Sequence, residues 1–400
     1  MGISMNISFK ERFQIRREAE KFIKNQQYEK AIHCFKEAYL KFPQHHWYAL
    51  WIGDLCRYYL KDSESALRWY EPPLTGEHRL KDTSALSPTR YLLKRVSNMY
   101  FDLQNWEKTC HYFDWFIGFQ PSNFHDKEFV RYAYALDQMG KQSKALEILQ
   151  LGMQHSSSID IKECWNKLSQ EKIEIKPFPK VRHGYERIPV KTDIIMPGAN
   201  IAAVVDEYTR DLRKPGDILT MASCVVAVAE RRMYSADSIK ASLLAKLLSR
   251  AVHDDQFPFG GNAPLCNPLS MQAAINESGW WRILMAAAFG GVISKLIKGS
   301  GMFYRLAGEQ AALIDDMPGA IPPFDYYVVM GPRNATATCR AIKDCTGHES
   351  AIIDANDLQI AWAVGCSNPS LKSTIEETMK DNPAGNGDQR TPLIILRPLQ

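Results

Sequence analysis

The chain has 400 residues, of which 45% are hydrophobic and 24% charged, a composition typical of a folded globular protein. Its formal net charge is +4, without the strong basic excess that binding along a nucleic-acid backbone needs. The longest apolar run, residues 283–293, is shorter than the ~20 residues of a membrane span. We therefore expect two domains, no nucleic-acid partner and no membrane partner.

The cysteines and the N-terminal residues indicate where the protein resides. Nine cysteines are scattered along the chain, and none stands in C-x-x-C spacing. This pattern favours reduced thiols over a disulfide or zinc framework. The first residues contain no apolar signal core, and Asn6 stands where a myristoylation motif has Ser or Thr. We predict a cytoplasmic protein.

Residues 1–170 are rich in helix-forming and aromatic residues and contain an internal repeat. The segment that begins at Tyr28 reappears at Trp106, each with a small residue three positions on and an aromatic residue seven positions on. Equivalent small residues recur at spacings of 35, 43 and 36, namely Ala31, Ala66, Thr109 and Ala145. These spacings bracket the ~34-residue tetratricopeptide (TPR) period.

Helix packing explains the repeated residues. A small residue lets the second helix of a pair approach the first, the aromatic residue fills the groove, and Pro43 or Pro121 ends the pair. The segment resembles an all-α TPR-type helical solenoid, with a generic helical bundle as the alternative. The resemblance implies a concave surface, the TPR groove, that binds a protein or peptide partner.

The pattern changes at two prolines, Pro177 and Pro179, which predict a linker over residues 171–180. Residues 181–400 then alternate short β-like stretches with helical ones, which predicts one α+β domain. The predicted strands are 188–190, 217–221, 225–228, 326–330, 351–354 and 393–396, and the predicted helices include 200–212 and 238–248.

A series of short motifs gives this second domain a family resemblance. Gly216-Asp217 opens a predicted strand, and Val225 is followed by Ala229-Glu230-x-Arg232. Further on stand Phe-Tyr-Arg at 303–305, Asp-Ala-Asn-Asp at 354–357 and Asn-Pro-Ala-Gly at 382–385. In this order, the motifs over residues 180–400 resemble the coenzyme F-420-0:γ-glutamyl ligase-like domain.

The resemblance implies a two-lobed α+β fold that is usually a homodimer. It also implies a reaction in which GTP, with Mg²⁺ or Mn²⁺, activates a small-molecule carboxylate as an acyl phosphate. The amine of an amino acid, glutamate in the family, then displaces the phosphate and forms an amide. The chain has no G-x-x-x-x-G-K-[ST] phosphate-binding loop, so a carboxylate-bound cation would have to neutralise the triphosphate.

Two acidic clusters are candidate metal ligands. Asp354, Asn356 and Asp357 follow an apolar run, so their oxygens lie where a strand is expected to end, and Glu230 is a further carboxylate ligand. An Asx turn that caps the next helix explains the first cluster equally well. The second cluster, residues 253–255, is more simply a solvated loop.

Two glycine-rich segments are candidates for binding phosphate and substrate. Lys298, Gly299, Gly301 and Arg305 combine backbone amides with two cations, as phosphate requires, although a tight turn explains the glycines nearly as well. Asn382, Gly385 and Gln389 precede a predicted buried strand, from which a loop can present side chains to a cleft. A surface loop is the alternative for this segment.

Some residues depart from the ligase pattern. Ser223 and Cys224 replace polar and basic residues, Arg231 replaces a glycine, and the Thr-Asp-Thr-x-Gly-Arg run is missing. Cys224 is expected to be a buried thiol on a strand rather than a nucleophile. Trp280 and Trp281 are expected in a helix core, and Asp315 in a turn.

Three functions remain open at this stage. The first is an acid–amino-acid ligase with a TPR module. The second is an inactive ligase-like domain that serves as a nucleotide or metabolite sensor or as an adaptor. The third is a ligase to which the solenoid delivers a protein substrate.

Overall fold

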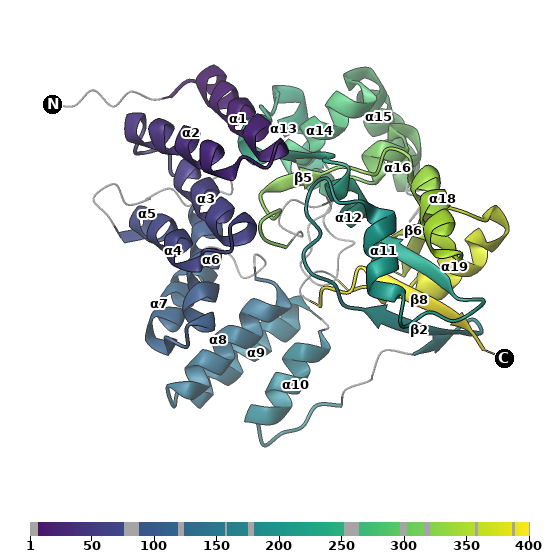
Figure 1. Cartoon of the computed structure of the whole chain (residues 1–400), viewed down its shortest axis with the longest axis horizontal. Coiled ribbons are helices and arrows are strands. Elements are labelled where there is room, and N and C mark those ends of the chain that lie inside the picture. The colour runs from purple at the N-terminus through teal and green to yellow at the C-terminus, as the bar shows by residue number, and fades with distance from the viewer. Residues whose placement is uncertain are drawn as a thin grey trace. The chain divides into compact units, whose positions relative to one another are not determined.

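The computed structural model describes residues 7–75, 88–118, 124–156, 158–174, 180–251, 264–296, 302–315, 321–356, 359–385 and 389–399. The chain forms two compact units, the first ending at Ile175 and the second beginning at Lys176. The first unit is built of helices, and the second combines helices with a sheet (Figure 1).

The described part of the first unit is helical throughout. Its helices are α1 (Phe9–Lys24), α2 (Tyr28–Lys41), α3 (Trp47–Asp54) with a π-helical turn (Leu55–Tyr59), α4 (Ser63–Tyr70), α5 (Pro72–Thr75), α6 (Thr89–Asp102), α7 (Trp106–Ile117), α8 (Asp126–Gln138), α9 (Gln142–His155) and α10 (Ile159–Leu168). The predicted all-helical N-terminal region is therefore confirmed.

Small residues allow close approach between successive helices of this unit. Each helix packs on its neighbours in the sequence, as α1 does on α2 and α6 on α7. A Cβ atom at Gly53 would overlap the Tyr70 ring, and one at Gly152 would lie 2.9 Å from the Phe129 ring. Only glycine permits these contacts between α3 and α4 and between α8 and α9. This nearest-neighbour stacking is compatible with a repeat architecture.

The described residues of the second unit form eight strands. They are β1 (Val181–Arg182), β2 (Tyr185–Val190), β3 (Ile218–Ala222), β4 (Met233–Ser235), β5 (Tyr327–Val329), β6 (Glu349–Asn356), β7 (Ile360–Cys366) and β8 (Leu393–Pro398). Its α-helices are α11 (Ile201–Thr209), α12 (Ser223–Ala229), α13 (Leu243–Ala251), α14 (Pro268–Ser278), α15 (Trp280–Leu296), α16 (Met302–Ala307), α17 (Glu309–Ala312), α18 (Ala335–Thr346) and α19 (Lys372–Met379). This content confirms the predicted α+β class.

Six strands form one mixed sheet in the order β1-β2-β8-β3-β6-β7, while β4 and β5 form a separate ribbon. The neighbours β3 and β6 are parallel, and the other neighbours are antiparallel. The carboxyl ends of β2, β3 and β6 therefore lie at one end of the sheet, together with the first residues of β7 and β8.

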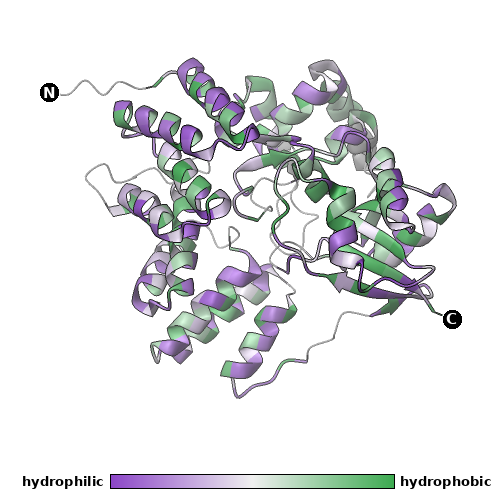
Figure 2. Ribbon diagram, in the orientation of Figure 1, coloured by the Kyte–Doolittle hydropathy of each residue, from purple (hydrophilic) through white to green (hydrophobic). Residues whose placement is uncertain are grey.

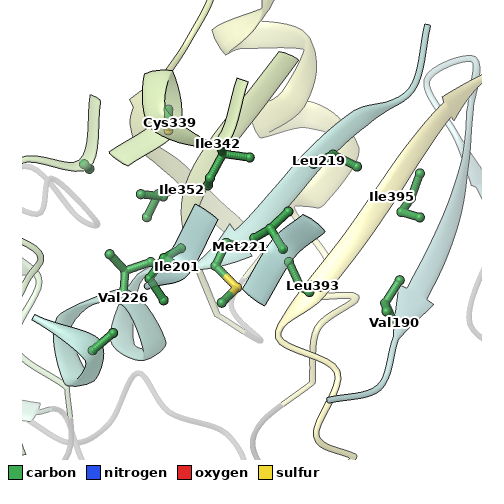
Figure 3. Close-up of a cluster of buried hydrophobic side chains, with 13 residues drawn as sticks. Val190, Ile201, Leu219, Met221, Val226, Cys339, Ile342, Ile352, Leu393 and Ile395 are labelled. Carbon is green, nitrogen blue, oxygen red and sulfur yellow. The ribbon is translucent and has the colours of Figure 1, made fainter. Parts of the chain in front are cut away.

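Hydrophobic side chains cover both faces of this sheet because the strand residues alternate in direction. On one face Leu219, Met221 and Ile352 pack against Ile201 of α11 and Ile342 of α18 (Figure 3). On the other face, buried side chains of the sheet pack with α19, including Ile218, Ala351, Ile353, Ile375, Met379 and Ile394. Figure 2 shows hydrophobic residues along the central strands. Burial of each large aliphatic side chain contributes ~2 kcal/mol.

Two sequence predictions for this unit are wrong. Residues 225–228 belong to helix α12 and not to a strand, so Cys224 also lies on a helix. Trp280 and Trp281 are not in a helix core, since they are 57% and 59% exposed. Within the described residues, no helix is long and apolar enough to cross a membrane.

Candidate functional site

Several chain segments converge at the sheet end formed by the carboxyl ends of β2, β3 and β6. The last residue of β3, Ala222, donates its backbone N–H to the carbonyl of Pro392, just before β8, at 2.9 Å. Thr192, just after β2, donates its N–H to the Arg390 carbonyl at 2.8 Å. The parallel pair β3 and β6 ends here, and ligands of parallel α/β sheets bind at the carboxyl ends of such strands, so this end is the candidate site.

At the centre of the site Ser223 and Asp354 form a hydrogen bond. Ser223 is the first residue of α12, and its Oγ donates to Asp354 Oδ1 at 2.9 Å. Asp354 and Asn356 stand two residues apart near the end of β6, so their side chains leave the same face of the sheet. Burial raises the pKa of Asp354 above its usual value, partly offset by the Ser223 hydrogen bond.

A second carboxylate, that of Asp315, lies near Cys224, the residue after Ser223. Burial raises the pKa of the Cys224 thiol, and the charges of Asp315 and Asp354 raise it further. Asp315 is fixed by its backbone N–H, which donates to the Val329 carbonyl of β5 at 2.9 Å. A thiol held protonated in this way is a poor nucleophile, so Cys224 marks the neighbourhood of two carboxylates rather than a catalytic thiolate.

The predicted substrate loop is anchored at the same end of the sheet. Gly385 donates its N–H to the Asn382 carbonyl at 3.0 Å, and its Cα is turned toward the Gln389 side chain. Asn382 is buried, and the loop continues into β8 beside β3. The preceding residue, Asp381, is fixed by Arg187, whose Nη2 lies 3.2 Å from Asp381 Oδ2. The structure thus brings Asn382, Gly385 and Gln389 together.

The opposite end of α12 has a structural role. Glu230 accepts a hydrogen bond from the Arg333 backbone N–H at 2.7 Å. Arg232 donates to the Gly331 carbonyl at 2.7 Å and pairs with Glu277 of α14 at 2.9 Å. Glu230 stands seven residues after Ser223 along α12, ~10 Å along the helix axis from the residue that contacts Asp354. The structure therefore does not bring Glu230 to the same point as Asp354.

The remaining predicted residues belong to segments that the structure describes in part. Asp357, the cluster 253–255 and Lys298, Gly299 and Gly301 lie outside the described residues. Arg305 lies on α16.

The described residues of the site fit a cation that takes only one or two ligands from the protein. They contain no group of three or more His, Cys, Asp or Glu side chains that could hold a metal by themselves. Mg²⁺ commonly takes one or two carboxylates and fills its other positions with water and substrate phosphates. Asp354 supplies one such carboxylate.

One known family matches part of the second unit. The model of the F420-0:Gamma-glutamyl ligase family matches residues 189–353. The matched segment runs from β2 through β6 and ends one residue before Asp354. No curated protein matches the chain. The second unit is therefore ligase-like, and the candidate site lies at the strand ends of the matched segment.

Sequence reasoning missed two residues of the site. From the sequence alone, Ser223 is a departure from the ligase pattern, and Asp315 is expected in a turn. Ser223 and Asp354 are 131 positions apart, so no local spacing links them. One available signal was the position of Ser223 directly after the predicted strand 217–221.

Proposed function

We propose that the second unit is an acid–amino-acid ligase that uses a nucleotide and a divalent cation to join a glutamate-like amino acid to a carboxylate. The observation that carries the proposal is the Ser223–Asp354 pair, a half-buried carboxyl group at the strand ends of the ligase-like segment. Asp354 and Asn356 would hold Mg²⁺ or Mn²⁺, which supplies charge neutralisation for the phosphates. The loop with Asn382 and Gln389 would orient the substrate.

Phosphate release tests this proposal. The full chain is assayed with GTP or ATP, Mn²⁺, glutamate and a panel of small dicarboxylates, and each component is omitted in turn. We expect release that requires the nucleotide, the cation, the amino acid and an acceptor together. Release that does not depend on the amino acid would indicate a simple nucleotidase and would contradict the proposal.

The second candidate function is a binding domain without turnover. It is favoured by the raised pKa of Asp354, because a carboxyl group that resists ionisation offers less negative charge to a cation. A ligand that binds only the folded state raises stability by RT ln(1 + [L]/Kd). Thermal stabilisation by GTP and Mn²⁺ without phosphate release would support this function instead.

For the helical unit, we propose a TPR-type solenoid that binds a protein or peptide. The proposal is supported by the repeat spacing and by the stacking of successive helices. A stable complex brought down by the full chain, and lost when α8 residues such as Arg131 are substituted, would support it. Arg131 pairs with Asp102 at 2.9 Å, donates to Asn98 and stacks over the Phe101 ring, so the test also requires that the variant unfold at the wild-type temperature. If the captured protein becomes modified with glutamate, the helical unit delivers a substrate.

A further inference from the structure

Helix α15 exposes apolar side chains that a helix of a globular protein normally buries. Trp280, Trp281 and Phe289 are 57%, 59% and 53% exposed. The two indole rings contact each other edge to face, with their centroids 5.5 Å apart. Large exposed aromatic residues in one helix mark a surface that a partner covers.

The exposed residues follow the helical period. Ile283 and Ala286 are buried and face the rest of the unit. Trp281, Met285 and Phe289 stand at i, i+4 and i+8, so they line one outward stripe, in which Met285 is half-buried. The outward stripe of a surface helix is ordinarily polar. Helix α16, which packs along α15, adds the exposed Leu306.

Basic residues outnumber acidic ones in the sequence of this helix pair, which Glu277 precedes and Glu309 follows, and Arg282 is exposed on α15. Residues 278–308 contain four basic side chains, Arg282, Lys295, Lys298 and Arg305, and no Asp or Glu. Exposed tryptophan and aliphatic residues with an excess of cations match the boundary between anionic headgroups and acyl chains.

Helix α13 of the same unit also exposes aliphatic and basic side chains and no acidic ones. Helix α13 places Leu243, Lys246, Leu247 and Arg250 on its exposed side at i, i+3, i+4 and i+7. Residues 238–251 contain three basic residues and no acidic one. Helix α13 packs on α14, and α14 packs on α15, so these helices form one group within the unit (Figure 1).

We propose that the α15 face, formed by Trp280, Trp281, Phe289 and Leu306, docks on the surface of an anionic lipid bilayer. A second copy of the chain fits less well, because a two-fold contact would place the same cations opposite one another. Tryptophan favours the interfacial region, where its ring is in the apolar layer and its N–H in the polar one. The absence of a described membrane-spanning helix does not bear on such contact, which requires no span.

Sedimentation with vesicles tests the proposal. The full chain is mixed with phosphatidylcholine vesicles that contain phosphatidylglycerol, and with vesicles of phosphatidylcholine alone. We expect binding to the anionic vesicles that weakens as salt rises, because salt screens the attraction. The double variant Trp280→Ser/Trp281→Ser should bind about tenfold more weakly. Leu40→Ser, at a 77% exposed position of α2, is the matched control and should bind as the wild type does.

Tryptophan fluorescence gives a second readout. Brominated phosphatidylcholine in the anionic vesicles should quench the wild-type emission and quench the double variant less, provided that both proteins unfold at the same temperature. Equal binding of wild type and double variant would overturn the proposal, as would equal binding to neutral and anionic vesicles. Self-association of the wild type that is lost in the double variant, without vesicle binding, would show that a second copy covers this face.

Discussion

The two ends of the central sheet each hold a carboxyl group, buried at one end and half-buried at the other, in opposite ways. At one end Asp217 is fully enclosed and accepts from Arg397 Nε at 3.0 Å, Arg397 Nη2 at 2.9 Å and the Lys214 N–H at 2.7 Å. At the other end Asp354 accepts from an uncharged hydroxyl, and burial raises its pKa. A cation thus balances the charge of Asp217, whereas the environment of Asp354 disfavours its charge. The first arrangement holds strands together, and the second leaves a carboxyl group for a ligand.

The same contrast appears along α12. Its first residue, Ser223, faces the candidate site, while the residues after its last turn fasten other elements of the unit. Glu230 binds the backbone before α18, and Arg232 joins α14 to the segment after β5. A motif that resembles the ligases can therefore serve the architecture even where the sequence suggests a ligand role.

The largest expected effect is that of Asp354→Asn on turnover. If the proposed ligase activity is present, phosphate release should fall about 1000-fold, because the cation or acid–base group is removed. Stability at neutral pH should be unchanged or higher, since a carboxyl group with a raised pKa in the folded state costs stability when ionised. Asp344→Asn, at an exposed position of α18, is the control and should retain full activity. Unchanged turnover in Asp354→Asn would refute the site.

Asp217→Asn should act in the opposite way. Loss of the carboxylate leaves the Arg397 guanidinium without its charged partner, which should lower the free energy of unfolding by about 3 kcal/mol. Phosphate release per folded molecule should be preserved, because Asp217 lies at the far end of β3. Urea unfolding followed by circular dichroism measures the first quantity. An unchanged unfolding midpoint would show that the two sheet ends do not differ as described.

The helical unit also holds a partly buried ionisable group whose charged form is disfavoured, the imidazole of His45. Burial, with the charges of Arg12 and His46, lowers the pKa of His45 to about 3. The unfolded chain then binds more protons than the folded one below about pH 6.5, so stability falls as pH decreases through that range. At pH 5 the loss should be about 2 kcal/mol. His45→Gln should remove this loss in thermal unfolding, whereas His111→Gln, at an exposed position, should keep it.

Glu230→Gln should have the smallest effect. The amide oxygen of glutamine can still accept the hydrogen bond from the Arg333 N–H, so the loss of stability should stay below about 1 kcal/mol. Titration calorimetry with Mn²⁺ in the presence of GTP should give the same affinity as for the wild type. A large drop in Mn²⁺ affinity would place Glu230 among the cation ligands and remove its purely structural role.

Much of the fold could be predicted from the sequence because the strands carry strong local signals. The predicted strands at 188–190, 217–221, 351–354 and 393–396 all lie in the central sheet, where short β-branched runs are buried on both faces. Residues 225–228 were misassigned because a short apolar run has no visible period when it is buried.

The site itself was only partly predictable. Asp354 and Asn356 follow an apolar strand, and that local pattern pointed to them. Their relation to Ser223 and Asp315 depends on which strands neighbour each other, and β3 and β6 are far apart in the sequence. The exposure of Trp280 and Trp281 could not be predicted from the sequence either, because an apolar helix that meets a partner has the same composition as one buried in a core.

The most direct test is a crystal soaked with GTP and Mn²⁺, in which the anomalous scattering of manganese locates the cation. The account predicts a manganese peak at the carboxyl ends of β3 and β6, within coordination distance of Asp354, with the nucleotide phosphates beside it. Manganese bound elsewhere, with the Ser223–Asp354 hydrogen bond intact and no nucleotide at the sheet end, would contradict it.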